Sequence, residues 1–208
     1  HRTRVLEVPG SAFAAYTWGT TVSPVTPALT DRPYLAREVL PDGTPATANL
    51  LDAFDRRFQL GTLEAASIAP IARLLGVGTV VFRGDLEQSG RFDTPPADRT
   101  WDRLQPAPPG LAETATFGAG AGSAPGVPAV ALFDVSAPQP IVRAAPTAAP
   151  VVLAGDGDGI VDAAAAGLLD GRGLVLYAAA LRGAALDRAL DDGAHLVVTD
   201  SNRRRIQT

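Results

Sequence analysis

The sequence contains no cysteine, no methionine and no lysine, and it has only two histidines. Without cysteine the chain cannot form disulfides, use a thiol nucleophile or bind a metal through sulfur. Two histidines are too few for a histidine-built zinc centre. Without lysine there is no phosphate-binding loop of the Gly-Lys-Ser/Thr type. We therefore expect no metal site and no cofactor in this chain.

The charge of the chain also limits its partners. Its 18 basic residues are all arginine, and 22 acidic residues give a net charge of −4, which makes it a poor binder of nucleic-acid backbones. No run approaches the ~20 apolar residues that a membrane-spanning helix needs. With 46% hydrophobic and 19% charged residues, the chain can still bury a core. We expect a folded α/β chain with no nucleic-acid partner.

The two ends of the sequence suggest a piece of a longer protein. The chain begins at His1 without an initiator methionine or a signal segment, and it ends just after an arginine run at 203–205. A processed mature chain is the alternative. Its 208 residues fit one large domain or two small ones.

The first part of the chain, 1–104, predicts an α/β lobe. Residues 4–8 alternate and stop at Pro-Gly, which predicts a short strand. Thr44 and Pro45 are typical of a helix start, and apolar residues follow at helical spacing at 50, 51, 54 and 58. A second helix over 64–75 and a buried strand over 77–82 come next.

A region rich in glycine and proline, 105–148, predicts a connector with short strands, the clearest at 130–135. The last part, 149–208, alternates strand, helix, strand, helix and strand, the strands being 151–153, 174–177 and 196–198. Such alternation favours a parallel sheet. We predict one α/β domain, either undivided or of two lobes, with a three-layer parallel or mixed sheet and a Rossmann-like C-terminal half.

The loop Gly155-Asp156-Gly157-Asp158-Gly159 follows a predicted strand and precedes a predicted helix. Ligands often bind at this edge of a parallel sheet. The third glycine comes one residue too early for a dinucleotide fingerprint, and two aspartates would repel a pyrophosphate. The Asp pair lacks the rest of a calcium loop. A tight turn in which Asp158 caps the helix is the preferred interpretation.

A second polar group, Thr199-Asp200-Ser201-Asn202 with Arg203 and Arg204, follows the last strand. Acids, amides and guanidinium groups together suit sugar hydroxyls or phosphates. We prefer a structural clasp, in which Arg203 or Arg204 pairs with Asp156 or Asp158. A solvated basic run is the third possibility.

A third group is the loop that holds the aromatic residues Tyr16, Trp18 and Tyr34 and the charged residues Asp31 and Arg32. Aromatic rings near carboxylates are common in carbohydrate platforms, although such rings also cover cores. No catalytic motif is recognisable: there is no nucleophile elbow of the Gly-x-Ser-x-Gly type. We name no catalytic residue.

Six ordered stretches along the chain point to one family: 4–11 (RVLEVPGS), 16–19 (YTWG), 29–33 (LTDRP), 65–77 (AASIAPIARLLGV), 155–164 (GDGDGIVDAA) and 199–205 (TDSNRRR). Together they resemble the actinobacterial membrane α-(1→3)-arabinofuranosyltransferases. The resemblance implies a polytopic enzyme that branches cell-wall arabinan of arabinogalactan or lipoarabinomannan with a lipid-phosphate arabinose donor. It also implies that the reaction centre lies in a membrane-embedded part that this sequence does not contain.

The resemblance therefore implies a non-catalytic domain on the extracytoplasmic, periplasmic face of the plasma membrane. Its expected partners are the arabinan acceptor and, in the same chain, the membrane-embedded catalytic part and carbohydrate-binding modules. The residues that we expect to contact carbohydrate are Tyr16, Trp18, Asp200, Asn202 and Arg203. The alternatives are an independent hydrolase or transferase with a site at 155–159 and 199–203, or a purely structural spacer.

Overall fold

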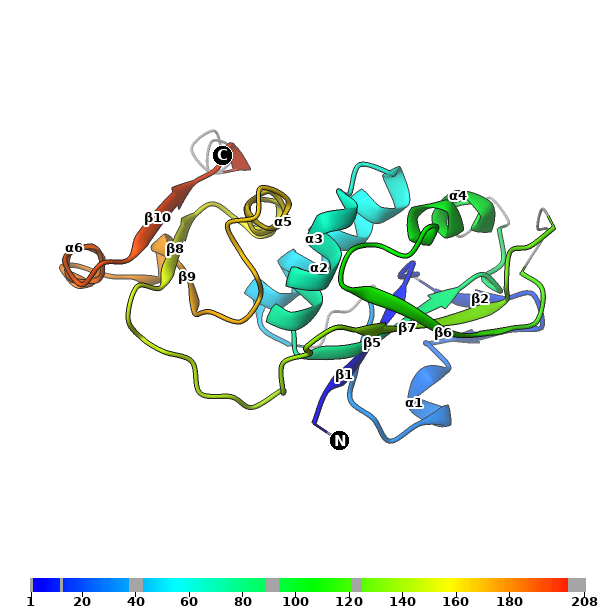
Figure 1. The fold of residues 1–208 in the computed structure, drawn as a ribbon. Helices are drawn as coiled ribbons and strands as arrows, with labels where there is room; N and C mark the ends of the chain where they lie inside the picture. Colours follow the sequence, from blue (N-terminus) through cyan, green and yellow to red (C-terminus); the bar gives the residue numbers. More distant parts are fainter. Residues whose placement is uncertain (1, 12, 38–42, 89–93, 121–124, 202–208) are drawn as a thin grey trace.

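The computed structural model describes residues 2–11, 13–37, 43–88, 94–120 and 125–201. They form two sheets with helices packed between them, so the α/β class predicted from the sequence is confirmed (Figure 1). A small hairpin of β2 (Ala14–Tyr16) and β3 (Gly19–Val22) stands apart from both sheets. The short helix α1 (Thr26–Leu29) follows this hairpin.

The first sheet is mixed and has five strands in the order β4-β1-β5-β7-β6. Its parallel part consists of β4 (Tyr34–Leu35), β1 (Arg4–Val8) and β5 (Val77–Arg83). Its antiparallel part adds β7 (Val130–Val135) and β6 (Leu111–Phe117). The carboxyl ends of β4, β1 and β5 therefore point to the same edge.

Strands β6 and β7 lie in the region 105–148, which the sequence analysis described as a connector with short strands. In the structure they are long strands of the first sheet, and the segment between the two sheets begins only after Val135. Strand β6 was missed because it is an edge strand. Only Leu111 of its seven residues is buried, so its sequence carries little apolar alternation.

The second sheet consists of three parallel strands in the order β10-β8-β9. They are β8 (Val151–Ala154), β9 (Val175–Tyr177) and β10 (His195–Val198). Helix α5 (Gly157–Ala165) connects β8 to β9, and the 3-10 turn η2 (Ala178–Ala180) with helix α6 (Ala185–Asp191) connects β9 to β10. This is the strand-helix alternation that the sequence predicted.

Helix α2 (Pro45–Leu60) shows why the local prediction succeeded. The Thr44 hydroxyl accepts a hydrogen bond from the Thr47 amide at 3.3 Å, and the helix ends at Gly61, whose φ is 72°. Its buried apolar side chains are those that the spacing predicted, together with Ala53: Leu50, Leu51, Ala53, Phe54 and Phe58. Helix α3 (Ala65–Leu74) follows and contains Pro70 in its interior.

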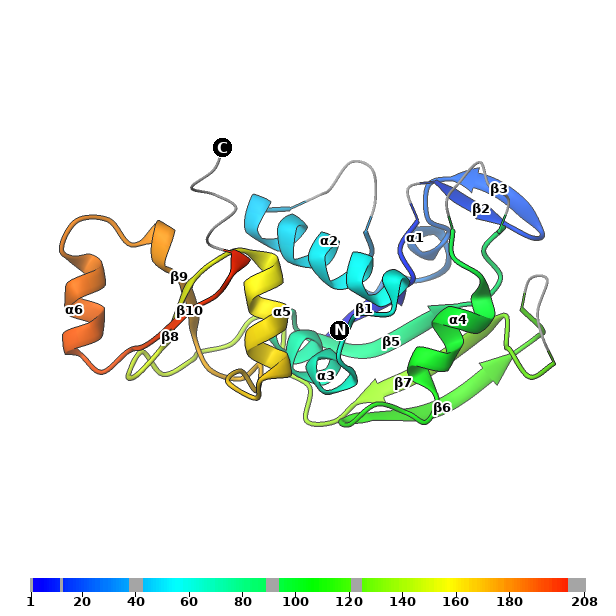
Figure 2. The ribbon, with the colours of Figure 1, turned by 90° about the horizontal axis from the view of Figure 1, so that it is seen from above.

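Both sheets contribute to one hydrophobic core. Helix α5 lies between the second sheet and the pair α2 and α3, which cover the first sheet (Figure 2). The continuous core cluster accordingly includes Phe82 and Phe133 of the first sheet, Phe54 of α2, Ile160 of α5 and Leu153 of the second sheet. Helix α4 (Ala97–Trp101) and the turn η1 (Asp102–Leu104) close the far end, where Trp101 packs on Phe82.

Substituting Phe82→Ala tests this core. Phe82 is fully buried, so we expect the free energy of unfolding to fall by about 3–5 kcal/mol. The matched control is Phe117→Ala on β6, whose ring is 56% exposed and whose loss is expected to cost under about 1 kcal/mol. Urea unfolding measures both; equal losses would contradict this description of the core.

Candidate functional site

The loop 155–159 is a structural joint. Asp156 is the N-cap of α5: its side chain accepts hydrogen bonds from the amides of Asp158 and Gly159 at 3.0 and 3.4 Å. The prediction that Asp158 is the capping residue is therefore wrong, although the turn itself is confirmed. The cap falls to Asp156 because it lies just outside the first helical residue, where the side chain can reach back to free amides.

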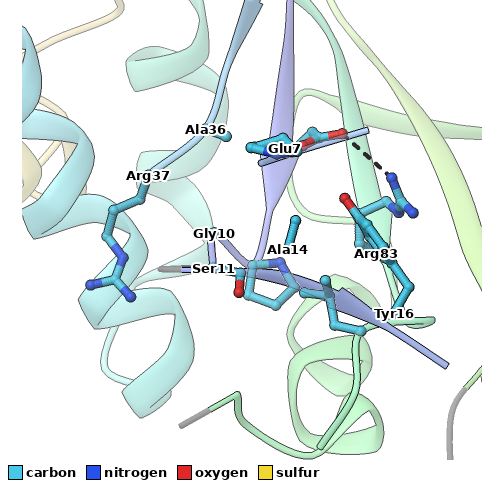
Figure 3. Close-up of a pocket in the computed structure, with 11 residues that line it drawn as sticks. Glu7, Gly10, Ser11, Ala14, Tyr16, Ala36, Arg37 and Arg83 are labelled. Carbon is cyan, nitrogen blue, oxygen red and sulfur yellow. Dashed lines mark ion pairs between the residues drawn. The ribbon is translucent and has the colours of Figure 1, made fainter. Parts of the chain in front are cut away.

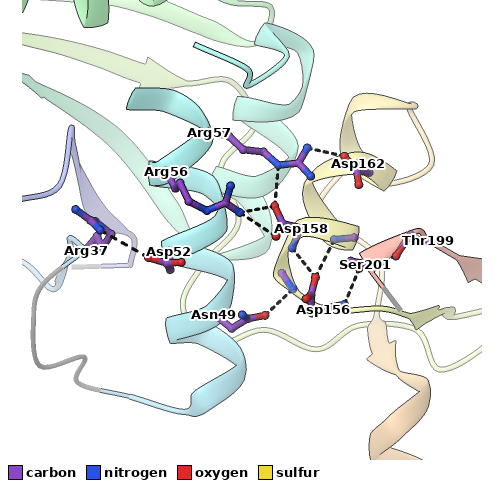
Figure 4. Close-up of polar contacts among 12 residues, drawn as sticks. Arg37, Asn49, Asp52, Arg56, Arg57, Asp156, Asp158, Asp162, Thr199 and Ser201 are labelled. Carbon is purple, nitrogen blue, oxygen red and sulfur yellow. Dashed lines mark hydrogen bonds and ion pairs between the residues drawn. The ribbon is translucent and has the colours of Figure 1, made fainter. Parts of the chain in front are cut away.

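Asp158 instead forms ion pairs with helix α2. Its carboxylate accepts from Arg56 Nη2 at 2.7 and 2.9 Å and from Arg57 Nε at 2.8 Å, while Arg57 Nη1 contacts Asp162 at 2.5 Å (Figure 4). Burial favours a raised pKa of Asp158, but the hydrogen bonds and charges of Arg57 and Arg56 outweigh it, so the pKa lies below its usual value.

The predicted clasp of Asp156 or Asp158 with Arg203 or Arg204 involves residues outside the described part of the chain, as does the predicted contact residue Asn202. Asp200 is described and is exposed. The arginines that hold Asp158 come from α2, about a hundred positions away in the sequence. No local pattern in the sequence indicates such a partner.

The edge of the second sheet is filled by the protein itself. A Cβ atom at Gly155 or Gly159 would lie 2.3 or 2.4 Å from the Thr199 hydroxyl, and one at Gly157 would lie 2.5 Å from the Asn49 carbonyl oxygen. The Asp156 amide donates to the Ser201 hydroxyl at 3.1 Å, and the Gly157 amide donates to Asn49 Oδ1 at 2.6 Å (Figure 4). The glycines thus allow close packing of protein groups at the described part of this edge.

Substituting Asp158→Asn tests the joint. At pH 7 we expect a loss of about 1–3 kcal/mol in the free energy of unfolding, because Arg56 loses its carboxylate partner and Arg57 keeps only Asp162. A lowered pKa in the folded state stabilises above the unfolded pKa of about 3.9. The difference between the two proteins should therefore vanish as the pH falls through the folded pKa.

Urea unfolding at several pH values measures this effect. The matched control is Asp187→Asn, in the first turn of α6, where the acidic residue is exposed and should matter little. A loss for Asp158→Asn that did not change with pH would contradict the ion-pair explanation.

Tyr16 and Trp18, two of the predicted carbohydrate-contact residues, form an aromatic pair. Their rings stack with centroids 4.6 Å apart and planes 5° apart. Trp18 Nε1 donates to Asp85 Oδ2 at 2.9 Å, yet 58% of this tryptophan is exposed. Because one ring face lies on Tyr16 and the Nε1 edge lies on Asp85, the exposed surface is the remaining ring face and edges. The indole is therefore both fixed and accessible.

Beneath the aromatic pair lies Arg83, which the sequence analysis did not single out. Its Nε and Nη2 both donate to the Asp85 carboxylate at 2.8 Å, and its Nη1 lies 3.6 Å from Glu7 Oε1. The guanidinium carbon lies 4.5 Å from the centroid of the Tyr16 ring. Burial raises the pKa of Tyr16, so its hydroxyl stays protonated while it accepts a hydrogen bond from the Val25 amide.

The signal that could have revealed this cluster is charge at the ends of buried strands. Glu7 interrupts the apolar strand β1, and Arg83 ends the apolar strand β5, with Asp85 two residues later. Glu7, Arg83 and Asp85 are all buried, which is rare for charged residues unless they are paired.

A small pocket opens beside Glu7 and Arg83 (Figure 3). Its cavity measures about 20 Å³, which is enough for one water molecule and too little for a sugar ring. Its lining comes from the carboxyl ends of all three parallel strands of the first sheet, with Gly10 after β1, Arg37 after β4 and Leu86 after β5. In α/β proteins this edge is where ligands usually bind.

Asp55 of α2 binds two residues that line the pocket, Gly10 and Arg37. It is 3% exposed and accepts hydrogen bonds from the Gly10 amide at 2.7 Å and from Gln59 at 2.6 Å, while Arg37 Nε lies 2.8 Å away. Burial raises the pKa of Asp55 to about 6, against these hydrogen bonds and the charge of Arg37. Asp55 thus ties α2 to the turn after β1 and to the end of β4.

The raised pKa of Asp55 predicts a pH dependence. Between the unfolded pKa of about 3.9 and the folded value of about 6, the folded chain keeps a proton that the unfolded chain releases. This carboxyl should therefore lower the free energy of unfolding by about 2 kcal/mol as the pH rises from 4 to 7. Asp55→Asn should remove that component.

Urea unfolding at pH 4, 5, 6 and 7 compares the two proteins. Asp52→Asn on the same helix is the control, because the Asp52 side chain is 56% exposed. A curve for Asp55→Asn parallel to that of the unmodified chain would contradict the raised pKa.

With this geometry in view, comparison with known proteins identifies the family. The family model for the N-terminal GT-C domain of alpha-(1->3)-arabinofuranosyltransferase matches residues 1–208. The chain belongs to this arabinofuranosyltransferase family. The alpha-(1->3)-arabinofuranosyltransferase of Mycobacterium tuberculosis is 33% identical to it over 147 residues, which cover 65% of this chain and 10% of that protein. The resemblance seen in the sequence is thereby confirmed.

Solved structures of the mycobacterial arabinofuranosyltransferase AftD, determined by cryo-electron microscopy, have the same fold. One matches with a TM-score of 0.58 at 28% identity over 72% of this chain, and a mutant form matches with a TM-score of 0.64 at 27% identity over 77%. The chain spans only 12% and 14% of the length of those structures.

Two further properties hold for the described residues of this family member. None of their helices is long and apolar enough to cross a membrane. They also contain no group of three or more metal-binding side chains of the His, Asp and Glu type.

Proposed function

We propose that this segment is a non-catalytic extracytoplasmic domain of an arabinofuranosyltransferase that branches cell-wall arabinan. In this proposal it contacts the arabinan acceptor through Trp18 and Tyr16. The membrane-embedded part of the same protein would carry the reaction with a lipid-phosphate arabinose donor. Carbohydrate-binding modules of the same protein would be its other partners.

Membership of the arabinofuranosyltransferase family supports an arabinan ligand. The observation that carries the binding role is the fixed and exposed indole of Trp18, 58% accessible and held by Tyr16 and Asp85. The faces of sugar rings carry C–H groups, which are attracted to the negative face of an aromatic ring. A ring that is already immobilised loses little conformational entropy when a sugar binds.

The contribution of such a domain to catalysis would be positioning. A contact far from the reacting atoms can hold an acceptor hydroxyl near the donor carbon, which lowers the entropic part of the barrier. Such a role needs no catalytic residue in this segment. A purely structural spacer is the second candidate, and the shared core of the two sheets is the observation that favours it.

Titration of the 208-residue chain with an arabinan oligosaccharide separates the two candidates. We expect millimolar ligand to shift the indole N–H resonance of Trp18 and to leave that of Trp101 unchanged, because Trp101 packs in the core against Phe82. Trp18→Ala should weaken binding at least tenfold, equivalent to about 1.4 kcal/mol, and Trp18→Phe should restore part of it.

The matched control is Phe117→Ala, which removes an equally exposed aromatic ring on a different strand. Its binding should equal that of the unmodified chain. If neither indole shifts at millimolar ligand, the domain is a spacer and the platform proposal is wrong.

A further inference from the structure

We propose that Arg32 and Thr3 form a binding site for a phosphate group at the amino edge of the first sheet. The site goes beyond the proposed function and takes a different class of ligand. Trp18 is held by Asp85, just after the carboxyl end of β5, so the two sites lie at opposite edges of the sheet. The stretch 29–33, one of those that resemble the arabinofuranosyltransferase family, has no role in the proposed function.

The pairing of β1 with β4 brings Thr3 and Arg32 together. The two strands run parallel, and the Val5 amide of β1 donates to the Pro33 carbonyl oxygen at 2.9 Å. The residues just before the two strands therefore meet at the amino edge, where the segment from α1 to β4 passes the start of β1 (Figure 1). The Arg32 amide donates to the Thr30 hydroxyl at 3.1 Å, which fixes the backbone of the arginine.

Arg32 is half-buried, and its guanidinium lacks the strong partner that similar arginines have. Its one contact runs from Nη2 to the Thr3 hydroxyl at 3.5 Å, which is longer than an ordinary hydrogen bond. Its Nε is buried and has no hydrogen-bond partner among the described residues. The other half-buried or buried arginines of the described chain each have a carboxylate or carbonyl oxygen within 2.9 Å: Arg4, Arg37, Arg56, Arg57, Arg73, Arg83 and Arg143. A cation partly removed from water without such a partner favours a bound anion.

Thr3 adds a second unused donor to the site. Its hydroxyl accepts the long contact from Arg32, and its own hydrogen has no acceptor among the described residues. Gly78 on β5 makes room for this hydroxyl, because a Cβ atom at Gly78 would lie 2.4 Å from Thr3 Oγ1. The neighbouring Asp31 has an interaction of its own and forms no ion pair with Arg32 among the described contacts. Two adjacent side chains therefore hold donors without an acceptor.

A phosphate group matches this set of donors. The free hydrogens lie on Nη1 and Nη2 of Arg32 and on Thr3 Oγ1, so the ligand needs several acceptor atoms close together. A guanidinium binds two phosphate oxygens in parallel, and a further oxygen of the same group can accept from the threonine hydroxyl. A carboxylate has only two oxygens, which the guanidinium alone would occupy. The site therefore favours phosphate over carboxylate.

Two exposed aliphatic side chains near the site favour a lipid headgroup as the source of the phosphate. Leu29, at the end of α1, is 74% exposed and lies three residues before Arg32. Val142 is 89% exposed, and the amide of the preceding Ile141 donates to the backbone carbonyl just before Thr3 at 2.9 Å. These are the two most exposed large apolar side chains of the described residues. Apolar side chains beside a basic group are typical of segments that bind the surface of an anionic bilayer.

Titration of the 208-residue chain with inorganic phosphate tests the site. The reporter is the Nε–H resonance of Arg32, because this buried group is protected from exchange with water. We expect millimolar phosphate to shift it, and acetate at the same ionic strength to shift it far less. The indole resonance of Trp18 should not move, which separates this site from the proposed carbohydrate contact. No shift with phosphate, or an equal shift with acetate, would overturn the phosphate site.

Substituting the two side chains separately tests their roles, with the backbone amide resonance of Tyr34 as the reporter. We expect Arg32→Gln to weaken phosphate binding about tenfold and Thr3→Val, which removes one hydroxyl, about threefold. Urea unfolding of Arg32→Gln should match that of the unmodified chain, because the arginine has no strong partner to lose. The matched control is Arg172→Gln, which removes an exposed arginine and should bind phosphate normally. Equal losses for Arg32→Gln and Arg172→Gln, or no loss for Arg32→Gln, would overturn the site.

Vesicles identify the source of the phosphate. The 208-residue chain should sediment with vesicles of phosphatidylcholine and phosphatidic acid, and stay in solution with phosphatidylcholine alone. Leu29→Ser should weaken vesicle binding about threefold and leave the affinity for inorganic phosphate unchanged. The matched control is Leu60→Ser at the end of α2, where the side chain is 67% exposed. Binding of inorganic phosphate without binding of vesicles would overturn the lipid source, and vesicle binding that Arg32→Gln leaves unchanged would overturn the role of Arg32.

Discussion

The close approach of α2 and α5 at Gly157 is the constraint on which the arrangement of the two sheets depends. No side chain fits there, because a Cβ atom at Gly157 would lie 2.5 Å from the Asn49 carbonyl oxygen. The contact lets Ile160 and its neighbours on α5 join the core formed by α2 and the first sheet. Asp158 then fixes the orientation of α5 through Arg56 and Arg57. One shared core follows, in place of two small separate ones that would each bury a smaller fraction of their surface.

In each sheet, the carboxyl ends of the parallel strands form an edge where topology favours a ligand site. The two edges differ in whether protein groups fill the space there. At the edge of the second sheet, glycines bring Thr199, Ser201 and Asn49 into contact with the loop, so protein groups occupy the crevice. At the edge of the first sheet, a small cavity remains beside the buried side chains of Glu7 and Arg83. Topology therefore marks where a site can form, and the side chains at the strand ends decide whether space remains there.

Arg83 links this cavity to the aromatic surface. A buried guanidinium must be paired, and its two hydrogen bonds to Asp85 fix the carboxylate that also holds Trp18. The same guanidinium lies over Tyr16, so one charge orients both rings. The exposed indole is thus positioned from within the fold rather than by its own loop. Such support is what distinguishes a preorganised contact surface from an aromatic residue that happens to be exposed.

The sequence by itself determined the α/β class, the family, helix α2 with its cap at Thr44, and the parallel strands near the C-terminus, because these depend on local spacing and turn chemistry. It also singled out Tyr16 and Trp18, which the structure stacks on each other. It missed β6, whose exposed edge position carries no alternation, and it named the wrong aspartate as the cap of α5. Only the tertiary structure decided that Asp158 pairs with Arg56 and Arg57 and that Glu7 lies beside Arg83. These pairings join residues about 75 to 100 positions apart in the sequence. No local pattern in the sequence specifies which buried charge will face which.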